Sequence, residues 1–175
     1  MNELTINVVG APAPQGSKRA FVVNGRAVMA ESSKKVKPWR QDVKSAVEDL
    51  HEVVPALDQL PFTGPLEVVI DFYLPRPGYH FGTGRNAGVL KANAPTHVDK
   101  KPDADKLLRS TLDGLKEAGI YRDDAQVAIV TGRKYYANAA TGARITVRPL
   151  NVSPADGASP VTAAGETPAE EVLFP

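Results

Sequence analysis

The sequence predicts an α+β domain, a small mixed β-sheet flanked by two main helices. Three observations favour this fold class. Short runs of alternating apolar residues occur before, between and after two stretches whose apolar residues have helical spacing. An Asn-Gly pair between two apolar arms indicates a hairpin. The chain has 175 residues, 42% of them hydrophobic, and no internal repeat, so it is long enough for one domain with its own core.

The first half contains a strand, a hairpin and a helix. Apolar and polar residues alternate over residues 4–10, which predicts a strand. Residues 11–20 should form a loop because of their Pro and Gly content. The segment AFVVNGRAVMA predicts the hairpin around Asn24-Gly25. A helix is expected from about residue 37 to 53, with Ser32 or Ser33 as its cap. Its apolar face would comprise Trp39, Val43, Ala46, Val47 and Leu50. Because Trp39 belongs to this face, we expect it to pack against the core and not to stack on DNA bases.

The second half predicts a strand, a helix and a final strand pair. Residues 65–74 read as a strand that is buried on at least one face. A helix is expected from about residue 105 to 118, with Gly119 as its stop and its apolar face at Leu108, Leu112 and Leu115. Residues 125–136 should form a strand in which Val127 and Ile129 alternate against Ala128 and Val130. After a turn at 138–142, residues 143–147 should return as its partner strand.

A long segment, residues 75–100, separates the third expected strand from the second helix. It is rich in Pro and Gly and carries the bases Arg76, Arg85, Lys91 and Lys100. Structureless loops of this length are uncommon in compact domains and are usually functional or disordered. Two interpretations stay open, a mobile basic flap over a nucleic-acid site and a disordered insertion.

Composition narrows the functional classes. The chain has no Cys, which excludes disulfides and thiolate zinc sites and suits a reducing cytoplasm. No apolar run is long enough for a membrane helix, so we expect no membrane partner. Residues 1–150 form the expected domain, with 21 bases and 16 acids, a net charge of +5. That excess is compatible with a polyanionic partner. Residues 151–175 are acidic and rich in Ala and Pro, and should be a disordered tail.

Two pairs of acids bracket the second helix. Asp103 and Asp105 come at its start, and Asp123 and Asp124 precede the next strand. If these carboxylates converge, they need a cation, and hard oxygen ligands favour Mg²⁺ or Mn²⁺, the metals that support phosphodiester hydrolysis. The alternative is structural. Asp103 would then be an N-cap, Asp105 a first-turn acid and Asp123-Asp124 turn residues. The isolated histidines match no metal spacing.

The run KPDADKLLRSTLDGLKEAGIYRDDAQV, followed by Lys134, resembles the RusA family of Holliday junction resolvases, which are common in phages and prophages. The family pattern is Pro-Asp-x-Asp-Asn-Leu, an Asp within the helix, Asp-Asp-x-Gln with Val or Ile, and then a Lys. The resemblance is strong over residues 100–136, weaker to about Val147, and excludes the tail. The matching residues are Pro102, Asp103, Asp105, Leu107, Asp113, Asp123, Asp124, Gln126, Val127 and Lys134.

The resemblance implies a homodimer that cuts four-way DNA junctions with Mg²⁺ or Mn²⁺, in DNA recombination and repair. The family's catalytic, metal-binding aspartates fall on Asp103, Asp105 and Asp124. Two positions depart from the pattern, because Lys106 stands in place of Asn and Arg109 in place of a catalytically important Lys. Arg keeps the charge but cannot easily give up a proton. The alternative is a non-catalytic junction- or DNA-binding protein that kept the acidic fold.

Three further expectations concern partners. We expect DNA phosphates to be bound by Lys106, Arg109, Lys134, Arg76, Arg85 and Lys91. The first hairpin and the helix that carries Trp39 are the candidate dimer interface. The chain ends Glu170-Glu171-Val172-Leu173-Phe174-Pro175. One interpretation of this acid-flanked apolar tip is a docking peptide for replication proteins, but an unselected terminus is the simpler explanation.

Overall fold

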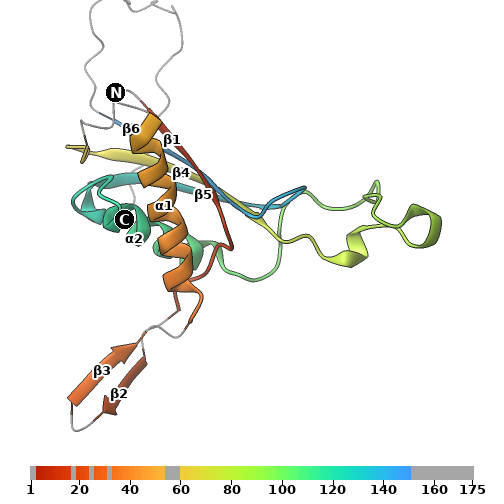
Figure 1. Ribbon diagram of the computed structural model, residues 1–175, viewed down its shortest axis with the longest axis horizontal. Helices are drawn as coiled ribbons and strands as arrows, with labels where there is room; N and C mark the ends of the chain where they lie inside the picture. The colour runs from red at the N-terminus through yellow and green to blue at the C-terminus, as the bar shows by residue number, and fades with distance from the viewer. Residues whose placement is uncertain (1–2, 17–18, 24–25, 31–32, 54–59, 151–175) are drawn as a thin grey trace, which may run out of the picture.

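The computed structural model describes residues 3–16, 19–23, 26–30, 33–53 and 60–150, and it confirms the α+β fold (Figure 1). A four-stranded mixed sheet has the order β1 (Leu4–Val9), β6 (Gly142–Pro149), β4 (Leu66–Leu74) and β5 (Val127–Tyr136). The helices are α1 (Val36–Val53) and α2 (Ala104–Glu117). The expected hairpin is present as β2 (Arg19–Val23) and β3 (Arg26–Ala30), apart from the main sheet, and its Asn24-Gly25 turn lies outside the described residues.

The core lies on one face of the sheet. Every second residue of β4 is buried while those between are partly exposed, as the period-2 geometry of a strand requires. Ile70 pairs with Ile145 of β6, which pairs with Ile6 of β1, and all three are fully buried. Helix residues such as Val43 and Leu107 complete this cluster. Each large apolar side chain buried in this way contributes about 1.5–3 kcal/mol.

The two helices are joined by polar contacts inside the core. Trp39 is fully buried, and its indole Nε1 donates a hydrogen bond to Thr111 Oγ1 at 3.0 Å. The packing role of Trp39 is therefore confirmed, and this face of α1 is not available to a partner. Ser110 Oγ donates to the carbonyl of Ala13 at 2.5 Å, which fixes the loop after β1 against α2. Ser33 Oγ accepts from Lys35 N in the turn before α1, whereas Ser32 lies outside the described residues.

The prediction that residues 125–136 and 143–147 pair with each other as a hairpin is wrong. β5 runs parallel to β4, and β6 pairs antiparallel with β4 and β1 instead of with β5. The five-residue loop after β5 therefore crosses the end of β4 to reach β6 on the other side. The two strands that flank β4 lie about 10 Å apart, a distance that five residues easily span. Helix α2 provides the crossover that a parallel β4–β5 pair needs.

β5 is an edge strand, and its expected alternation is also wrong. It begins at Val127, after a 3-10 helix at Asp124–Gln126, and both Ile129 and Val130 are exposed, by 47% and 44%. Neighbouring strand residues point to opposite faces, so both faces are open to solvent at residues 129 and 130, whereas Val127 packs against the core. Farther along, Leu108 of α2 packs against Gly132, where a Cβ would lie 2.9 Å from Leu108 carbons. The missing side chain lets α2 approach β5 closely.

Residues 75–100, which we call the arm, extend well away from the sheet (Figure 1) and return to it at residues 96–98, which pair with the end of β5. The arm has a defined course, with 3-10 turns at Gly78–His80 and Gly84–Asn86 and backbone bridges between residues 81 and 90 and between residues 82 and 87. Arg76 fastens its base. The guanidinium donates to the carbonyl of Pro95 at 2.9 Å and to Asn138 Oδ1 at 3.3 Å, and lies 5.2 Å from the Tyr136 ring centroid.

Among the described helices, none is long and apolar enough to cross a membrane. The expected tail, residues 151–175, and its apolar tip lie outside the described residues, so the tail and the docking of its tip stay predictions.

Candidate active site

Asp103 occupies the N-cap position of α2, but its side chain makes no capping hydrogen bond. Lys106 Nζ instead donates to Asp103 Oδ2 at 2.8 Å. This hydrogen bond, followed by the charge of Lys106, lowers the pKa of Asp103, and the same contact raises the pKa of Lys106. The residue that replaces the family's Asn therefore holds one of the three predicted metal-binding carboxylates.

Lys134 fixes the approach to α2. Its Nζ donates to the carbonyls of Lys100 and Pro102, at 2.8 and 2.9 Å, from the neighbouring strand β5. The contacts tie the segment before Asp103 to the edge of the sheet. The charge of Lys134 also helps to lower the pKa of Asp103. The Lys134 ammonium is engaged by backbone oxygens, and its contact with DNA phosphate stays a prediction.

The two acids before β5 have separate roles. Asp123 begins a capping box, because its Oδ1 accepts from Ala125 N at 2.9 Å while Gln126 Oε1 accepts from Asp123 N at 3.1 Å. Gln126 Nε2 donates in turn to the carbonyl of Phe62 at 2.9 Å. Asp123 and Gln126 therefore shape the turn, whereas Asp124 makes no capping bond and faces the pocket described next.

Asp105 and Asp124 line one pocket of about 480 Å³, which we call the acidic pocket. Asp105 comes from the first turn of α2 and Asp124 from the 3-10 helix before β5, so the chain does return to the start of α2. Arg109, one helical turn beyond Asp105, lines the same pocket. The remaining lining residues are Gln15, Leu108, Leu112, Asp113 and Val130.

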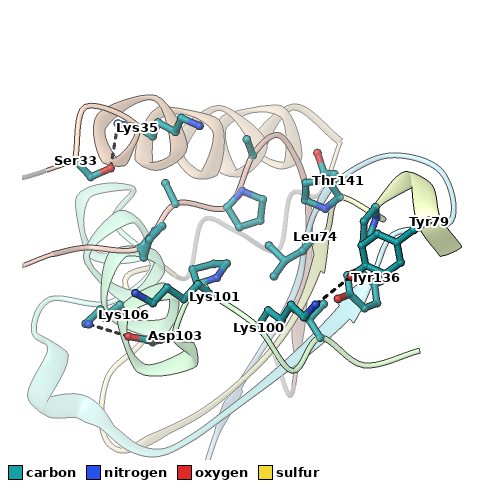
Figure 2. Close-up of a pocket in the computed structure, with 18 residues that line it drawn as sticks. Ser33, Lys35, Leu74, Tyr79, Lys100, Lys101, Asp103, Lys106, Tyr136 and Thr141 are labelled. Atoms are coloured by element: carbon teal, nitrogen blue, oxygen red, sulfur yellow. Dashed lines mark hydrogen bonds and ion pairs between the residues drawn. The ribbon is translucent and has the colours of Figure 1, made fainter. Parts of the chain in front are cut away.

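Asp103 lies elsewhere. It lines a larger pocket of about 880 Å³ between α1 and the segment before α2, which we call the lysine pocket (Figure 2). In the part of the chain that the structure describes, no three His, Asp or Glu side chains gather closely enough to hold a metal ion. The structure therefore brings together two of the three predicted ligands, Asp105 and Asp124, and leaves Asp103 with Lys106.

Sequence reasoning missed a polar clamp behind the acidic pocket. Arg40 of α1 makes an ion pair with Asp113, which lines the pocket, and donates to Gln15 Oε1 at 2.9 Å and to Glu117 Oε1 at 3.0 Å. Gln15 is itself buried and lines the pocket. Asp113 belonged to the matched motif, but its partner is 73 residues away and no local pattern identifies it.

The predicted DNA-binding bases differ in their surroundings. Arg109 and Arg85 are exposed. Lys91 Nζ donates to the carbonyl of Tyr79 at 2.8 Å, within the arm. The Arg76 guanidinium is hydrogen-bonded at the base of the arm, and Lys106 is paired with Asp103. These contacts rank Arg109 and Arg85 as the bases with the fewest contacts inside the chain.

Comparison with known proteins adds the family. The family described as Endodeoxyribonuclease RusA matches residues 10–148, which include both pockets and most of the sheet. The chain belongs to this family. It is also 28% identical over 139 residues to "Uncharacterized protein YqaN" of Bacillus subtilis (strain 168), a match that covers 78% of this chain and 89% of the relative. The resemblance to RusA is thus confirmed, and the chain is related to endodeoxyribonucleases.

Proposed function

We propose that the protein is a divalent-metal-dependent endodeoxyribonuclease that resolves four-way DNA junctions as a homodimer, with Asp103, Asp105, Asp124 and Arg109 as its catalytic residues. The observation that carries the proposal is the acidic pocket. Asp105 and Asp124, two carboxylates from separate elements, line it together with the Arg109 guanidinium, in a chain of the RusA family. A third carboxylate in its lining, that of Asp113, is paired with Arg40.

The residues of the acidic pocket fit a hard divalent cation. Mg²⁺ in nucleic-acid enzymes is typically held by one or two carboxylates, with water and phosphate oxygens completing its shell. Asp105 and Asp124 supply two such carboxylates, and no soft ligand lines the pocket. Asp103 would join them only after leaving Lys106. The chemistry that Mg²⁺ or Mn²⁺ supplies is polarisation of the scissile phosphodiester and activation of water.

Arg109 would act on the substrate by its charge. Its planar fork matches two phosphate oxygens, and a fixed positive charge at that point stabilises the negative charge that grows on the phosphoryl group. The clamp of Arg40 on Asp113 holds α2 against α1 and so keeps Asp105 and Arg109 in position. Lys134 does the same for the segment that leads to Asp103.

Dimerisation follows from the reaction proposed. Resolving a four-way junction needs two symmetric cuts, and each chain offers one acidic pocket, so a two-fold dimer supplies the pair. The first hairpin and helix α1, the interface expected from the sequence, stay predictions, and we add the first half of β5 as a candidate. Val130 lines the acidic pocket and Ile129 is exposed beside it, so a partner there would bring the two pockets near each other.

One observation favours a second candidate, a DNA-binding protein that retains the acidic fold without cleaving. Lys106 neutralises Asp103 and turns it toward the lysine pocket, so only two of the family's three acids share one site. If Mg²⁺ cannot draw Asp103 away from Lys106, such a protein would bind junctions and leave them intact.

The deciding experiment incubates labelled four-way junctions with the protein and Mg²⁺ or Mn²⁺. We expect paired nicks near the branch point that disappear in Asp105→Asn and in Asp124→Asn. The matched control is Asp123→Asn, because Asn can still cap the turn while one neighbouring charge is lost. Tight junction binding without nicking in the wild type, unchanged by Asp105→Asn, would establish the second candidate instead.

A further inference from the structure

The lysine pocket is much larger than the acidic pocket and combines two kinds of surface. Its walls are apolar, formed by the loop after β1, the ends of β4 and β5, and prolines of the arm. Lysines stand around its mouth. Lys35, before α1, lies on one side, and the lysines of the segment that leads into α2, Lys100, Lys101 and Lys106, lie on the other (Figure 2). Its volume of about 880 Å³ falls in the range of small-molecule sites.

The four lysines differ in the partners of their ammonium groups. Lys106 is paired with Asp103, and Lys100 Nζ donates to Tyr79 Oη at 3.2 Å. Lys35 and Lys101 are exposed and have no ion pair within the described ranges. Two unpaired ammonium groups across an apolar pocket attract an anion that carries an apolar or aromatic body.

Tyr79 supplies an aromatic surface at the rim. Tyr79 is 59% exposed, and its ring stands perpendicular to the His80 ring, with the two centroids 4.6 Å apart. Lys100 Nζ lies 5.5 Å from the ring centroid. An exposed ring with a cation beside it is the combination by which proteins hold unpaired nucleotides, with the base stacked and the phosphate neutralised.

We propose that the lysine pocket accepts one unpaired nucleotide of the DNA substrate, its base against Tyr79 and its phosphate between Lys35 and Lys101. The inference rests on the proposed action on DNA and adds a site for a single-stranded nucleotide. Such nucleotides occur where strands part at a branch point. Asp103 lines this pocket and is two residues from Asp105 in the acidic pocket, so an unpaired nucleotide held here would lie beside the phosphodiester to be cut.

The test measures binding of a fluorescent six-nucleotide thymidine oligomer, without divalent metal, by fluorescence anisotropy. Ala11→Trp fills the pocket without removing a charge, since Ala11 is exposed and lines it. We expect it to weaken binding at least about tenfold, the loss expected when one stacked base is excluded. The matched control is Ala139→Trp, in the exposed loop after β5 and outside this pocket, and its binding should stay within twofold of the wild type.

A second pair of variants tests stacking without filling the pocket. Tyr79→Leu keeps an apolar side chain but loses the ring, and we expect about tenfold weaker binding. Tyr79→Phe loses only the hydroxyl that accepts from Lys100, and should bind at least fivefold more tightly than Tyr79→Leu. Equal weakening by both would overturn the role of the ring, and undiminished binding by Ala11→Trp, with its fold verified by circular dichroism, would overturn the pocket.

Junction cleavage by the wild type, measured in parallel, separates this inference from the proposed function. Cleavage without binding of the oligomer overturns the nucleotide site and leaves the nuclease proposal standing. Binding of the oligomer that Ala11→Trp abolishes, in a protein that never cleaves, supports the nucleotide site and overturns the nuclease proposal.

Discussion

Lys106 Nζ and Asp103 Oδ2 lie 2.8 Å apart, three residues from each other on the first turn of α2. Both side chains are about half exposed, so the ion pair is screened by solvent and contributes little to stability. Its effect is on the site. An ammonium group is bound to one of the carboxylates proposed to hold a divalent cation, and such a cation would have to displace it.

Lys106→Asn should therefore strengthen metal binding. Removing one competing charge in a solvated site should raise the affinity for the metal roughly fivefold. We expect the Mg²⁺ concentration for half-maximal cleavage to fall about three- to tenfold, and calorimetry to show the same change for Mn²⁺. Lys116→Asn is the control, because it removes another α2 lysine paired with an aspartate, Asp123, outside both pockets. An unchanged metal requirement in Lys106→Asn would show that the pair does not limit metal binding.

Arg109 should act by charge and not by proton donation. The two lysines that could replace a general acid are engaged elsewhere, Lys106 with Asp103 and Lys134 with backbone carbonyls. Arg109→Gln should lower the single-turnover cleavage rate by about a hundredfold, as loss of one transition-state donor does. Arg109→Lys should keep the rate within about fivefold and leave the pH profile unchanged. A new alkaline limb in that profile, together with a faster rate, would instead identify a proton donor at this position.

The elements that sequence reasoning placed correctly depend on local signals. Asn24-Gly25 indicates a hairpin by its turn chemistry, Gly119 adopts φ of 79° and ends α2, and apolar spacing gives both helices. Strand partners depend on distant pairings that leave no local trace, so the β6–β4 pairing was missed. The site divides in the same way. The sequence motif identified Asp105 and Asp124. The ion pairs of Arg40 with Asp113 and of Lys106 with Asp103 could be identified only in the structure.

Ile129→Lys should dissociate the proposed dimer. β5 is paired only with β4 along residues 127–133, within the described residues, and an unprotected edge that exposes Ile129 and Val130 is suited to pairing. A two-fold interface contains each residue twice, so one substitution should raise the dimer Kd by at least about a hundredfold.

Light scattering over a range of concentrations measures this change. Val9→Lys is the matched control, because Val9 is also exposed but lies on the opposite edge strand, β1. If the wild type stays monomeric with and without junction DNA, the dimer proposal is wrong. If Ile129→Lys remains dimeric, the interface is not at β5.

The two arginines of the arm should have different roles, Arg85 as a contact to DNA phosphate and Arg76 in holding the base of the arm. Arg85→Gln should reduce the slope of log affinity against log salt by about 0.9 for each phosphate lost on duplex DNA, with an unchanged Tm. Arg76→Gln should lower the Tm, because the Arg76 guanidinium holds the base of the arm to Pro95 and Asn138. Junction binding titrated at several salt concentrations, with thermal melts of each variant, distinguishes the two. An Arg85 variant with the wild-type slope would exclude a phosphate contact at the arm tip.

His80 should make folding stability depend on pH. The ring is buried edge-on between Tyr79 and Tyr136, and Arg76 Nη1 lies 3.4 Å from its Nδ1. Burial first, and then the charges of Arg76, Lys100 and Lys91, lower the His80 pKa, and the negative charge of Asp99 only partly offsets this. The unfolded chain, with an ordinary His pKa near 6.5, therefore binds a proton more readily than the folded chain.

The stability that the neutral His80 contributes is thus fully present above about pH 6.5 and is lost as the pH falls below that value. Urea unfolding of the wild type and of His80→Asn at several pH values isolates this dependence, because every other ionisable residue is the same in both proteins. We expect the stability difference in favour of the wild type to shrink from about pH 7.5 to pH 5.5. A difference that stays constant would show that His80 titrates alike in the folded and unfolded chain, and one that grows toward acid pH would show a raised pKa.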